Sequence, residues 1–464
     1  MTTHSTSLYA QRRAKLAAQL GADAVAIIPT APEQARNRDS DFPYRHDSYF
    51  YYLTGFSEPH AWLVIDGQGR SSLFCQPKDL EREIWDGYRL GPDAAPKALG
   101  VDAAFSASDL DSQLPKLLEN QHTVWYPFAT HKGLETRVDG WINSVRARVR
   151  FGAICPAHQR DVCAVLDEMR LIKDVHEQDT MRRAARISAQ AHIRAMQTSA
   201  HMLRAGQDVR EYHLEAELLH EFRKHGSQFP AYTSIVAAGA NACVLHYRAD
   251  TAPVRSGDLV LIDAGCELDG YASDITRTFP ANGVFSPAQR DVYNLVLASQ
   301  EASIAATRPG ARFIDPHEAV VNVLSQGLLD LGLLNAKQHG TVDDVIEKRA
   351  YFRYYMHRTS HWLGMDVHDC GSYVEPSELG QVSTRQDPLS GETITNRPSR
   401  ILREGMVLTL EPGLYIRPAD DVPEAFWNIG IRIEDDALVT ANGCELMSRD
   451  VPVSVAEIEA LMRS

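Results

Sequence analysis

A short apolar run that ends in a carboxylate constrains the fold of this chain more than any other feature. Leu259–Ile262 is aliphatic throughout, which is typical of a strand buried on both faces in a layered α/β protein, and Asp263 follows it directly. A buried carboxylate costs free energy unless it is paired or binds a cation. An aspartate at a strand end is by itself more often a cap or half of a structural salt bridge, so the interpretation of Asp263 depends on its neighbours.

A second carboxylate is expected on the same face of the sheet. Asp269-Gly270 predicts a two-residue hairpin turn. With these residues as the loop, Asp263 lies opposite Thr276, and Asp274, two residues from Thr276, faces the same side. The two carboxylates are then diagonal neighbours, about 7–8 Å apart at the backbone, and can converge on two cations about 3.5–4 Å apart. Because like charges repel, a metal site is the simplest prediction.

Two glutamates are placed in a similar way. Glu411 follows the apolar run Met406–Leu410, which Pro412-Gly413 terminates. Further along, the isoleucines of a strand-like segment take one face, while Arg432 and Glu434 take the other and point charges toward a predicted interior. A structural Arg432–Glu434 pair on an exposed face is the alternative, and the sequence leaves both interpretations open.

Histidines provide the remaining candidate ligands. His357, His361 and His368 lie close together in the chain, and neutral imidazole both binds divalent ions and carries protons near neutral pH. His246 is a weaker candidate, with simple surface placement as the alternative. One histidine and four carboxylates form a hard, oxygen-rich site that suits Mn²⁺ and is compatible with Co²⁺ or Zn²⁺.

The length of 464 residues favours two domains. We predict an α/β protein with an N-terminal mixed α/β domain over residues 1–175 and a catalytic domain over residues 176–464. In the first domain, the apolar pattern predicts strands at Ala24–Ile28, Tyr49–Tyr52, Ala61–Ile65 and Ser72–Phe74, and helices at Leu8–Leu20 and Leu110–Leu118. In the second, Ser286 and Pro287 open a predicted helix that runs to Ile304, and the polar stretch Glu378–Arg400 predicts an exposed loop.

Composition excludes several classes of function. A net charge of −14 leaves no excess of lysine and arginine to neutralise phosphates, so we expect no nucleic-acid partner. No apolar run is long enough to span a bilayer. The N-terminus has no apolar signal core, and the 7 cysteines are scattered without C-x-x-C pairs. These features predict a cytoplasmic protein without a membrane partner.

Five motifs occur in order along the chain: LIDAG, SDITRTF, SHWLGMDVHD, LEPG and RIED. Together they resemble the aminopeptidase P and prolidase branch of the pita-bread metallopeptidases, whose catalytic domain is a duplicated α/β half-barrel. The N-terminal stretch DSDFPYRHDSYFYYLTGFSEP similarly resembles the first domain of bacterial aminopeptidase P. The resemblance covers most of the chain, and the five motifs in register make it specific.

The resemblance implies roles for individual residues. It makes Asp263, Asp274, His361, Glu411 and Glu434 the metal ligands, with Asp274 and Glu434 between the two ions, Asp263 on one ion, and His361 and Glu411 on the other. Glu411 is also expected to transfer protons. The remaining matched residues are expected to act in catalysis or to contact substrate: His246, His357, His368, Arg432, Tyr415 and Asp39. In tetrameric members of the family, the residue matching Asp39 approaches a neighbouring subunit's site.

The implied activity is release of the first residue from peptides that have proline in second place, with water activated between two divalent ions. A prolidase restricted to Xaa-Pro dipeptides would use the same site, and a pita-bread protein that binds without catalysis is a distant alternative. A dimer or tetramer is implied by resemblance alone. The stretch Glu378–Arg400 is longer than the resemblance leads us to expect, and its role stays open.

Overall fold

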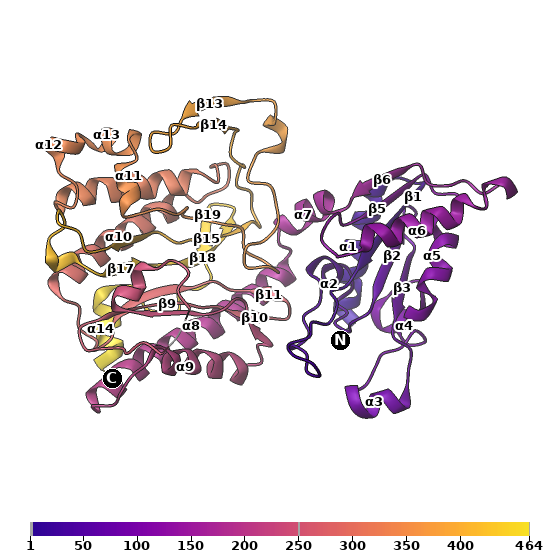
Figure 1. Cartoon of the computed structure of the whole chain (residues 1–464), viewed down its shortest axis with the longest axis horizontal. Coiled ribbons are helices and arrows are strands. Elements are labelled where there is room, and N and C mark those ends of the chain that lie inside the picture. The colour runs from indigo at the N-terminus through magenta and orange to yellow at the C-terminus, as the bar shows by residue number, and fades with distance from the viewer. Residues whose placement is uncertain (1–2, 249–250, 464) are drawn as a thin grey trace. The chain divides into compact units, whose positions relative to one another are not determined.

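The computed structural model describes residues 3–248 and 251–463. The chain divides after Met169 into two compact units. Both are mixed α/β structures, with a layered sheet in the first unit and interleaved helices and antiparallel strands in the second (Figure 1).

The first unit is built on one six-stranded sheet with the order β4-β3-β2-β1-β5-β6. Its central strand β1 (Ala24–Pro29) is fully buried and pairs antiparallel with β2 (Trp62–Asp66) and parallel with β5 (Thr123–Tyr126). The outer strands are β3 (Ser71–Cys75), β4 (Ala103–Ser106) and β6 (His158–Asp161). The helices of this part of the chain are α1 (Thr3–Leu20), α2 (Ser48–Thr54), α3 (Leu80–Asp86), α4 (Ala95–Leu99), α5 (Leu110–Leu118), α6 (Leu134–Arg146) and α7 (Cys163–Leu171), the last of which spans the boundary.

The strand predicted over Tyr49–Tyr52 is wrong, because these residues form helix α2. Asp47 caps the helix by accepting a hydrogen bond from the Phe50 backbone N–H at 2.9 Å, and Gly55 ends it in the left-handed conformation with φ 62°. Aromatic residues favour strands only weakly. Here the cap at each end determines the local structure.

The second unit repeats one arrangement twice. In each half a pair of long helices covers antiparallel strands: α8 (Val175–Arg204) and α9 (Glu211–Lys224) in the first half, and α10 (Pro287–Ala306) and α11 (Asp315–Asp330) in the second (Figure 1). The first set of strands comprises β7 (Phe229–Pro230), β8 (Ile235–Ala238), β9 (Leu259–Asp263), β10 (Cys266–Leu268), β11 (Tyr271–Ala272) and β12 (Thr276–Pro280). The second comprises β15 (Val407–Leu410), β16 (Gly413–Ile416), β17 (Ile429–Arg432), β18 (Asp435–Thr440) and β19 (Gly443–Leu446). Shorter helices α12 (Ala336–His339) and α13 (Val342–Glu347) follow α11, and α14 (Val455–Arg463) ends the unit.

The predicted hairpin register is confirmed. Asp263 pairs with Thr276 across β9 and β12, and the turn residues Asp269 and Gly270 both have positive φ, 50° and 82°, as a type I′ turn requires. The strands are interrupted between these two places, so the hairpin contributes to two small sheets instead of one. Helix α10 also begins as predicted, with the Ser286 hydroxyl accepting the Gln289 backbone N–H at 3.2 Å.

The two halves meet at a backbone junction at the start of β12. The Glu434 N–H donates to the Thr276 carbonyl at 3.0 Å, and the Thr276 hydroxyl donates to the Glu434 carboxylate at 2.6 Å. All of these atoms belong to residues that are at most 2% exposed. The junction therefore brings the carboxylates of both halves to one place.

The stretch Glu378–Arg400 is exposed, as predicted, but it is not irregular. It contains an antiparallel hairpin of β13 (Ser383–Gln386) and β14 (Thr393–Asn396), which Figure 1 shows beside α11–α13. Asp387 organises the turn by accepting the Leu389 N–H at 2.8 Å, and it pairs with Arg349 at 2.5 Å. Short strands with polar residues on both faces lack the apolar alternation that would have revealed them.

Two further features of the described residues bear on function. No helix among them combines the length and the apolar character needed to cross a membrane. All seven cysteines are free thiols.

Candidate metal centre

The first pair of predicted ligands converges on one hydroxyl. Tyr232 lies within hydrogen-bond distance of both Asp263, at 2.6 Å, and Asp274, at 2.5 Å. A phenol carries a single proton and donates one hydrogen bond. The single phenol proton serves only one of the two carboxylates at a time, whereas a bound cation would attract both.

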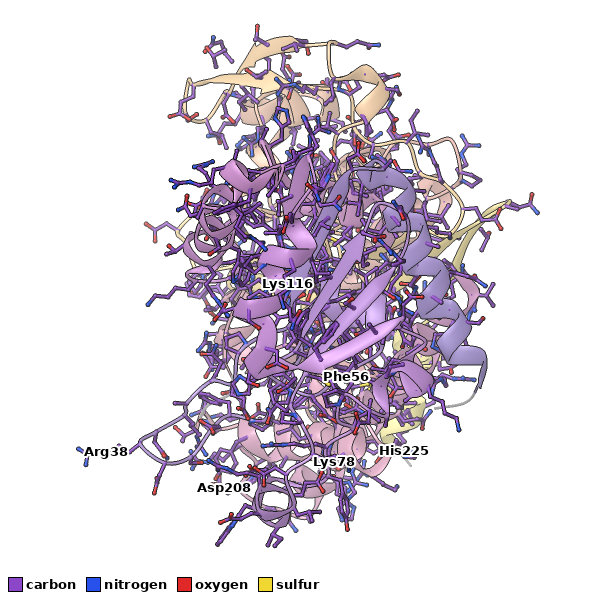
Figure 2. All side chains as sticks on the ribbon, turned by 90° about the vertical axis from the view of Figure 1, so that its right-hand side faces the viewer. Arg38, Phe56, Lys78, Lys116, Asp208 and His225 are labelled. Carbon is purple, nitrogen blue, oxygen red and sulfur yellow. The ribbon has the colours of Figure 1, made fainter. Side chains whose placement is uncertain are left out.

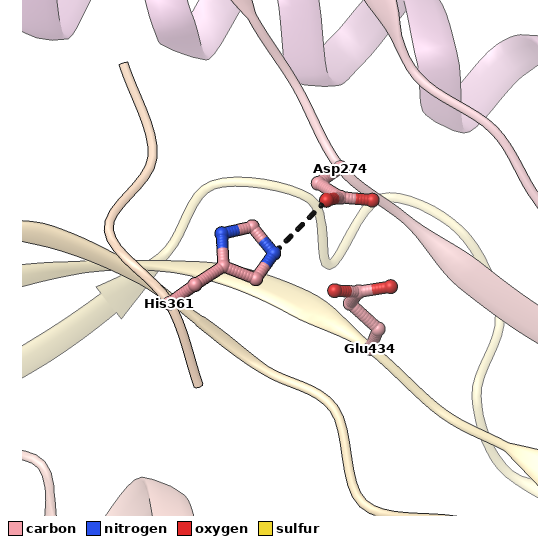
Figure 3. A group of neighbouring side chains, drawn as sticks. All are labelled: Asp274, His361 and Glu434. Atoms are coloured by element: carbon pink, nitrogen blue, oxygen red, sulfur yellow. Dashed lines mark ion pairs between the residues drawn. The ribbon is translucent and has the colours of Figure 1, made fainter. Parts of the chain in front are cut away.

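Glu434 and His361 complete a tight cluster with Asp274. One ligand atom from each residue lies within 4.8 Å of the other two (Figure 3). The His361 Nδ1 faces the Trp362 carbonyl oxygen at 2.9 Å, which requires a proton on Nδ1, so Nε2 is the ring nitrogen that can bind a metal once its own proton has left. Nε2 lies 3.4 Å from Asp274. A backbone contact on one ring nitrogen commonly prepares the other nitrogen to bind a metal.

His361 and Glu411 are held together by the edge of β15. Thr409 exchanges two hydrogen bonds with His361, through its backbone N–H at 3.0 Å and its hydroxyl at 3.1 Å. The Glu411 N–H donates to the Thr359 carbonyl at 2.8 Å. Glu411 consequently lies 3.8 Å from the His361 Nε2. Strand pairing, and not a flexible loop, sets the separation of these two candidate ligands.

Burial and mutual repulsion perturb the acidic groups strongly. Burial raises the pKa of Glu411 to about 7, and burial together with Asp274 raises the pKa of Glu434 well above its ordinary value. Burial alone would lower the pKa of His361, but Asp274 and Glu411 raise it to about 9. Several perturbed carboxylates that share one buried place mark a candidate functional site. The donor set of four carboxylates and one imidazole fits hard divalent ions.

Arg432 does not form the exposed structural pair with Glu434 that the sequence left open. It is 4% exposed, and its guanidinium donates to Asp263 at 2.5 Å and to the Tyr415 hydroxyl at 2.9 Å. Tyr415 in turn lies 2.9 Å from the His357 Nε2. Arg432 thus connects the candidate ligand Asp263 to the candidate catalytic residue His357 through Tyr415. Strand propensity alone would have assigned this tyrosine to packing.

Most of the predicted site residues line one cavity of about 460 Å³. It brings together all five predicted ligands with His246, His357, His368 and Arg432, and the His368 ring packs edge-on against His361 with centroids 4.4 Å apart. Burial and the nearby Arg432 charge lower the pKa of His357 to about 3, so this imidazole is neutral.

Asp39 is the predicted site residue that belongs to the first compact unit. It lies on an exposed loop, and its backbone N–H contacts Asn37 at 3.4 Å. The side chain of the preceding residue, Arg38, points outward from this loop (Figure 2).

Sequence reasoning missed the buried residues that support the site. Arg277, fully buried in β12, donates to the Glu434 carbonyl at 2.6 Å and pairs with Asp435 at 2.8 Å. Gln300 of α10 donates to the same aspartate at 3.0 Å. Arg277 lies in the motif SDITRTF and Asp435 in the motif RIED, so the sequence did mark both positions. Tyr232 lies outside all five motifs, and only the folded structure reveals its contact with the two aspartates.

Comparison with known proteins places the chain in a family. The model of metallopeptidase family M24 matches residues 179–441, and the model of the aminopeptidase P N-terminal domain matches residues 9–125. The chain belongs to metallopeptidase family M24. Its two halves of helix pairs and antiparallel strands agree with the predicted pita-bread catalytic domain, and the predicted fold class is confirmed.

Individual relatives extend over the whole chain. The Xaa-Pro aminopeptidase of Escherichia coli strain K12 is 43% identical, over 100% of this chain and 99% of the relative. A solved aminopeptidase of Pseudomonas aeruginosa has a TM-score of 0.91 at 47% identity, covering 99% of this chain and 98% of that one. A zinc-substituted E. coli aminopeptidase P in complex with product has a TM-score of 0.89 at 43% identity, with the same coverage.

The Arg277–Asp435 pair yields a prediction about stability. Arg277→Met leaves a buried aspartate whose remaining cationic partner is the partly exposed Arg449, at 3.2 Å, beside neutral donors from Gln300 and Ser448. Breaking a buried pair in this way should lower the free energy of unfolding by about 3 kcal/mol. Urea denaturation of the purified protein measures it.

The control is Arg353→Met, which removes an exposed pair with Asp421 and should change the denaturation midpoint little, because water already solvates both groups. Equal stability of the two variants would show that Arg277 does not hold the junction.

Proposed function

We propose that this chain is a two-metal Xaa-Pro aminopeptidase, which releases the first residue from peptides with proline in second place. The observation that carries the proposal is the convergence of Asp263, Asp274, His361, Glu411 and Glu434 in one cavity. The full-length likeness to a curated Xaa-Pro aminopeptidase and membership of a metallopeptidase family support it.

The same five residues would hold the ions. Asp274 and Glu434 would lie between two ions, Asp263 would bind one, and His361 and Glu411 the other. Oxygen-rich ligation favours Mn²⁺, with Co²⁺ or Zn²⁺ also compatible. Bound divalent ions would supply Lewis acidity, which makes water nucleophilic at neutral pH and polarises a carbonyl.

The protein's own groups would then move protons and bind charge. Glu411, a carboxylate on the cavity wall 3.8 Å from His357, is placed to accept the proton of the attacking water and to deliver one to the proline nitrogen. His368 can donate to the oxyanion that develops on the scissile carbonyl. The neutral His357, with its Nδ1 facing the Arg358 carbonyl at 2.7 Å, accepts from Tyr415 and fixes that hydroxyl. His246 remains a substrate contact on the cavity wall.

Proline selectivity would come from the apolar part of the cavity. An Xaa-Pro bond has no amide N–H, so recognition must act on the ring. Ile235, Leu245 and Val367 line the same cavity as the acidic residues and offer the apolar surface on which a pyrrolidine ring can pack.

Assembly and compartment belong to the same proposal. An exposed Asp39 suits a homo-oligomer, dimer or tetramer, in which this loop reaches the site of another copy. Free thiols throughout the chain suit a reducing, cytoplasmic compartment.

Substrate length separates the proposed activity from a prolidase. We expect the Mn²⁺-loaded protein to release the first residue from alanyl-prolyl-alanine faster than it cleaves alanyl-proline, and to leave alanyl-alanyl-alanine intact. Chromatography of the released amino acids measures all three. Cleavage of the dipeptide alone would instead identify a prolidase, and cleavage of none would indicate a non-catalytic protein.

Glu411→Gln tests the proton-transfer role. The amide cannot accept the proton, so kcat on the tripeptide should fall by roughly 10²–10⁴-fold while the protein stays folded. Glu404→Gln, on an exposed loop before the same strand, is the matched control and should keep full activity. Near-normal turnover in Glu411→Gln would exclude Glu411 as the base.

A further inference from the structure

Three arginines line the metal-site cavity, and two of them have no acidic partner among the described residues. Arg432 is committed to Asp263 and Tyr415. Arg248 and Arg358 line the same cavity and are exposed. Within residues 3–248 and 251–463, neither of these guanidinium groups forms an ion pair with a carboxylate. Unpaired cations inside a substrate cavity are available for a charged part of the ligand.

Arg248 and Arg358 are not needed to neutralise the carboxylates of the cavity. Two divalent ions together with Arg432 already outweigh the four carboxylates of Asp263, Asp274, Glu411 and Glu434. Once the ions are bound, Arg248 and Arg358 add positive charge to a site that is no longer acidic. The loaded cavity therefore favours a substrate that brings a negative group of its own.

Hydrogen bonds hold the backbone around Arg358 in place. Its carbonyl oxygen faces the His357 Nδ1 at 2.7 Å, and the next residue, Thr359, accepts the Glu411 N–H at 2.8 Å. Thr359 is fully buried. The backbone of Arg358 and of its neighbour is thus tied to His357 and Glu411, which fixes its position relative to them, while its side chain is exposed.

The length of a short peptide limits how far its carboxylate can lie from the reacting atoms. A peptide chain advances about 3.3 Å per residue when extended, and a cavity of about 460 Å³ holds only a short segment around the scissile bond. The residue after proline consequently lies near the cavity mouth, and its carboxylate is the first negative group beyond the reacting atoms. Guanidinium groups bind carboxylates through two parallel hydrogen bonds.

We propose that Arg358, assisted by Arg248, binds a carboxylate located just beyond the proline of the substrate. This inference rests on the proposed function and sharpens its substrate class to short peptides with a free C-terminus at the third residue, or peptides with an acidic third residue. Arg358 is a specificity-determining residue in this account and takes no part in proton transfer.

The test compares three peptides that differ in where they carry a negative charge: alanyl-prolyl-alanine, its C-terminal amide, and alanyl-prolyl-glutamic acid amidated at the C-terminal carboxyl alone, which keeps the side-chain carboxylate. With Mn²⁺ and the full chain, we expect kcat/KM for each charged peptide to exceed that of the neutral amide by roughly tenfold, as charge-assisted hydrogen bonds to a carboxylate allow. The gain should appear mainly in KM.

Variants locate the effect. Arg358→Gln should abolish most of the tenfold preference while leaving hydrolysis of the neutral amide nearly unchanged, and Arg358→Lys should restore part of it, since one ammonium keeps the charge but loses the bidentate geometry. Arg385→Gln is the matched control on the exposed strand β13 and should preserve the preference.

The outcomes are distinguishable. A preference for the free acid alone identifies the terminal carboxylate as the ligand, and a preference for the glutamyl amide alone identifies the side chain. Equal kcat/KM for all three peptides in the unmodified protein, or an equal loss on all three in Arg358→Gln, would overturn the inference and leave the aminopeptidase proposal standing. Failure to cleave any of them would instead overturn the proposed function.

Discussion

Mutual repulsion between four buried carboxylates is the constraint on which the rest of this structure depends. Asp263 and Asp274 come from one half of the second unit, and Glu411 and Glu434 from the other, and all four line one cavity. Burial and repulsion raise the pKa of Glu411 and Glu434. Like charges repel, so free side chains would move apart. The fold must therefore fix the positions of these groups through the backbone that carries them.

The backbone achieves this with few hydrogen bonds. Glu434 is tied to Thr276 through both its N–H and its carboxylate, and Arg277 clamps the Glu434 carbonyl. Asp263 lies opposite the same threonine in the β9–β12 ladder. One residue position therefore links a ligand of each half, and the duplicated architecture is what brings two such strand ends face to face.

The sequence predicts the local part of this arrangement well. Asp269-Gly270 specifies a turn with positive φ at both residues, so the register that aligns Asp263 and Asp274 follows directly. Ser286 and Pro287 likewise specify the start of α10. In these cases residues close in the chain determine the geometry, and no knowledge of distant contacts is needed.

Features that depend on long-range contacts could be predicted from the sequence only in part. Glu411, Glu434 and His361 could be grouped with the aspartates mainly through a resemblance in motif order, since their convergence depends on pairing between the two halves. The Arg432–Asp263 contact and the Tyr232 hydroxyl between two carboxylates depend on side-chain directions that no local pattern encodes. Tyr49–Tyr52 shows the opposite failure, where an aromatic run suggested a strand but the Asp47 and Gly55 caps made a helix.

We infer that the cavity binds two divalent ions. Anomalous diffraction from crystals of the Mn²⁺-loaded protein, recorded above and below the manganese absorption edge, tests it most directly. The account predicts two peaks about 3.5–4 Å apart, enclosed by Asp263, Asp274, His361, Glu411 and Glu434. Crystals grown with excess Mn²⁺ that show no anomalous peak among these residues would contradict it.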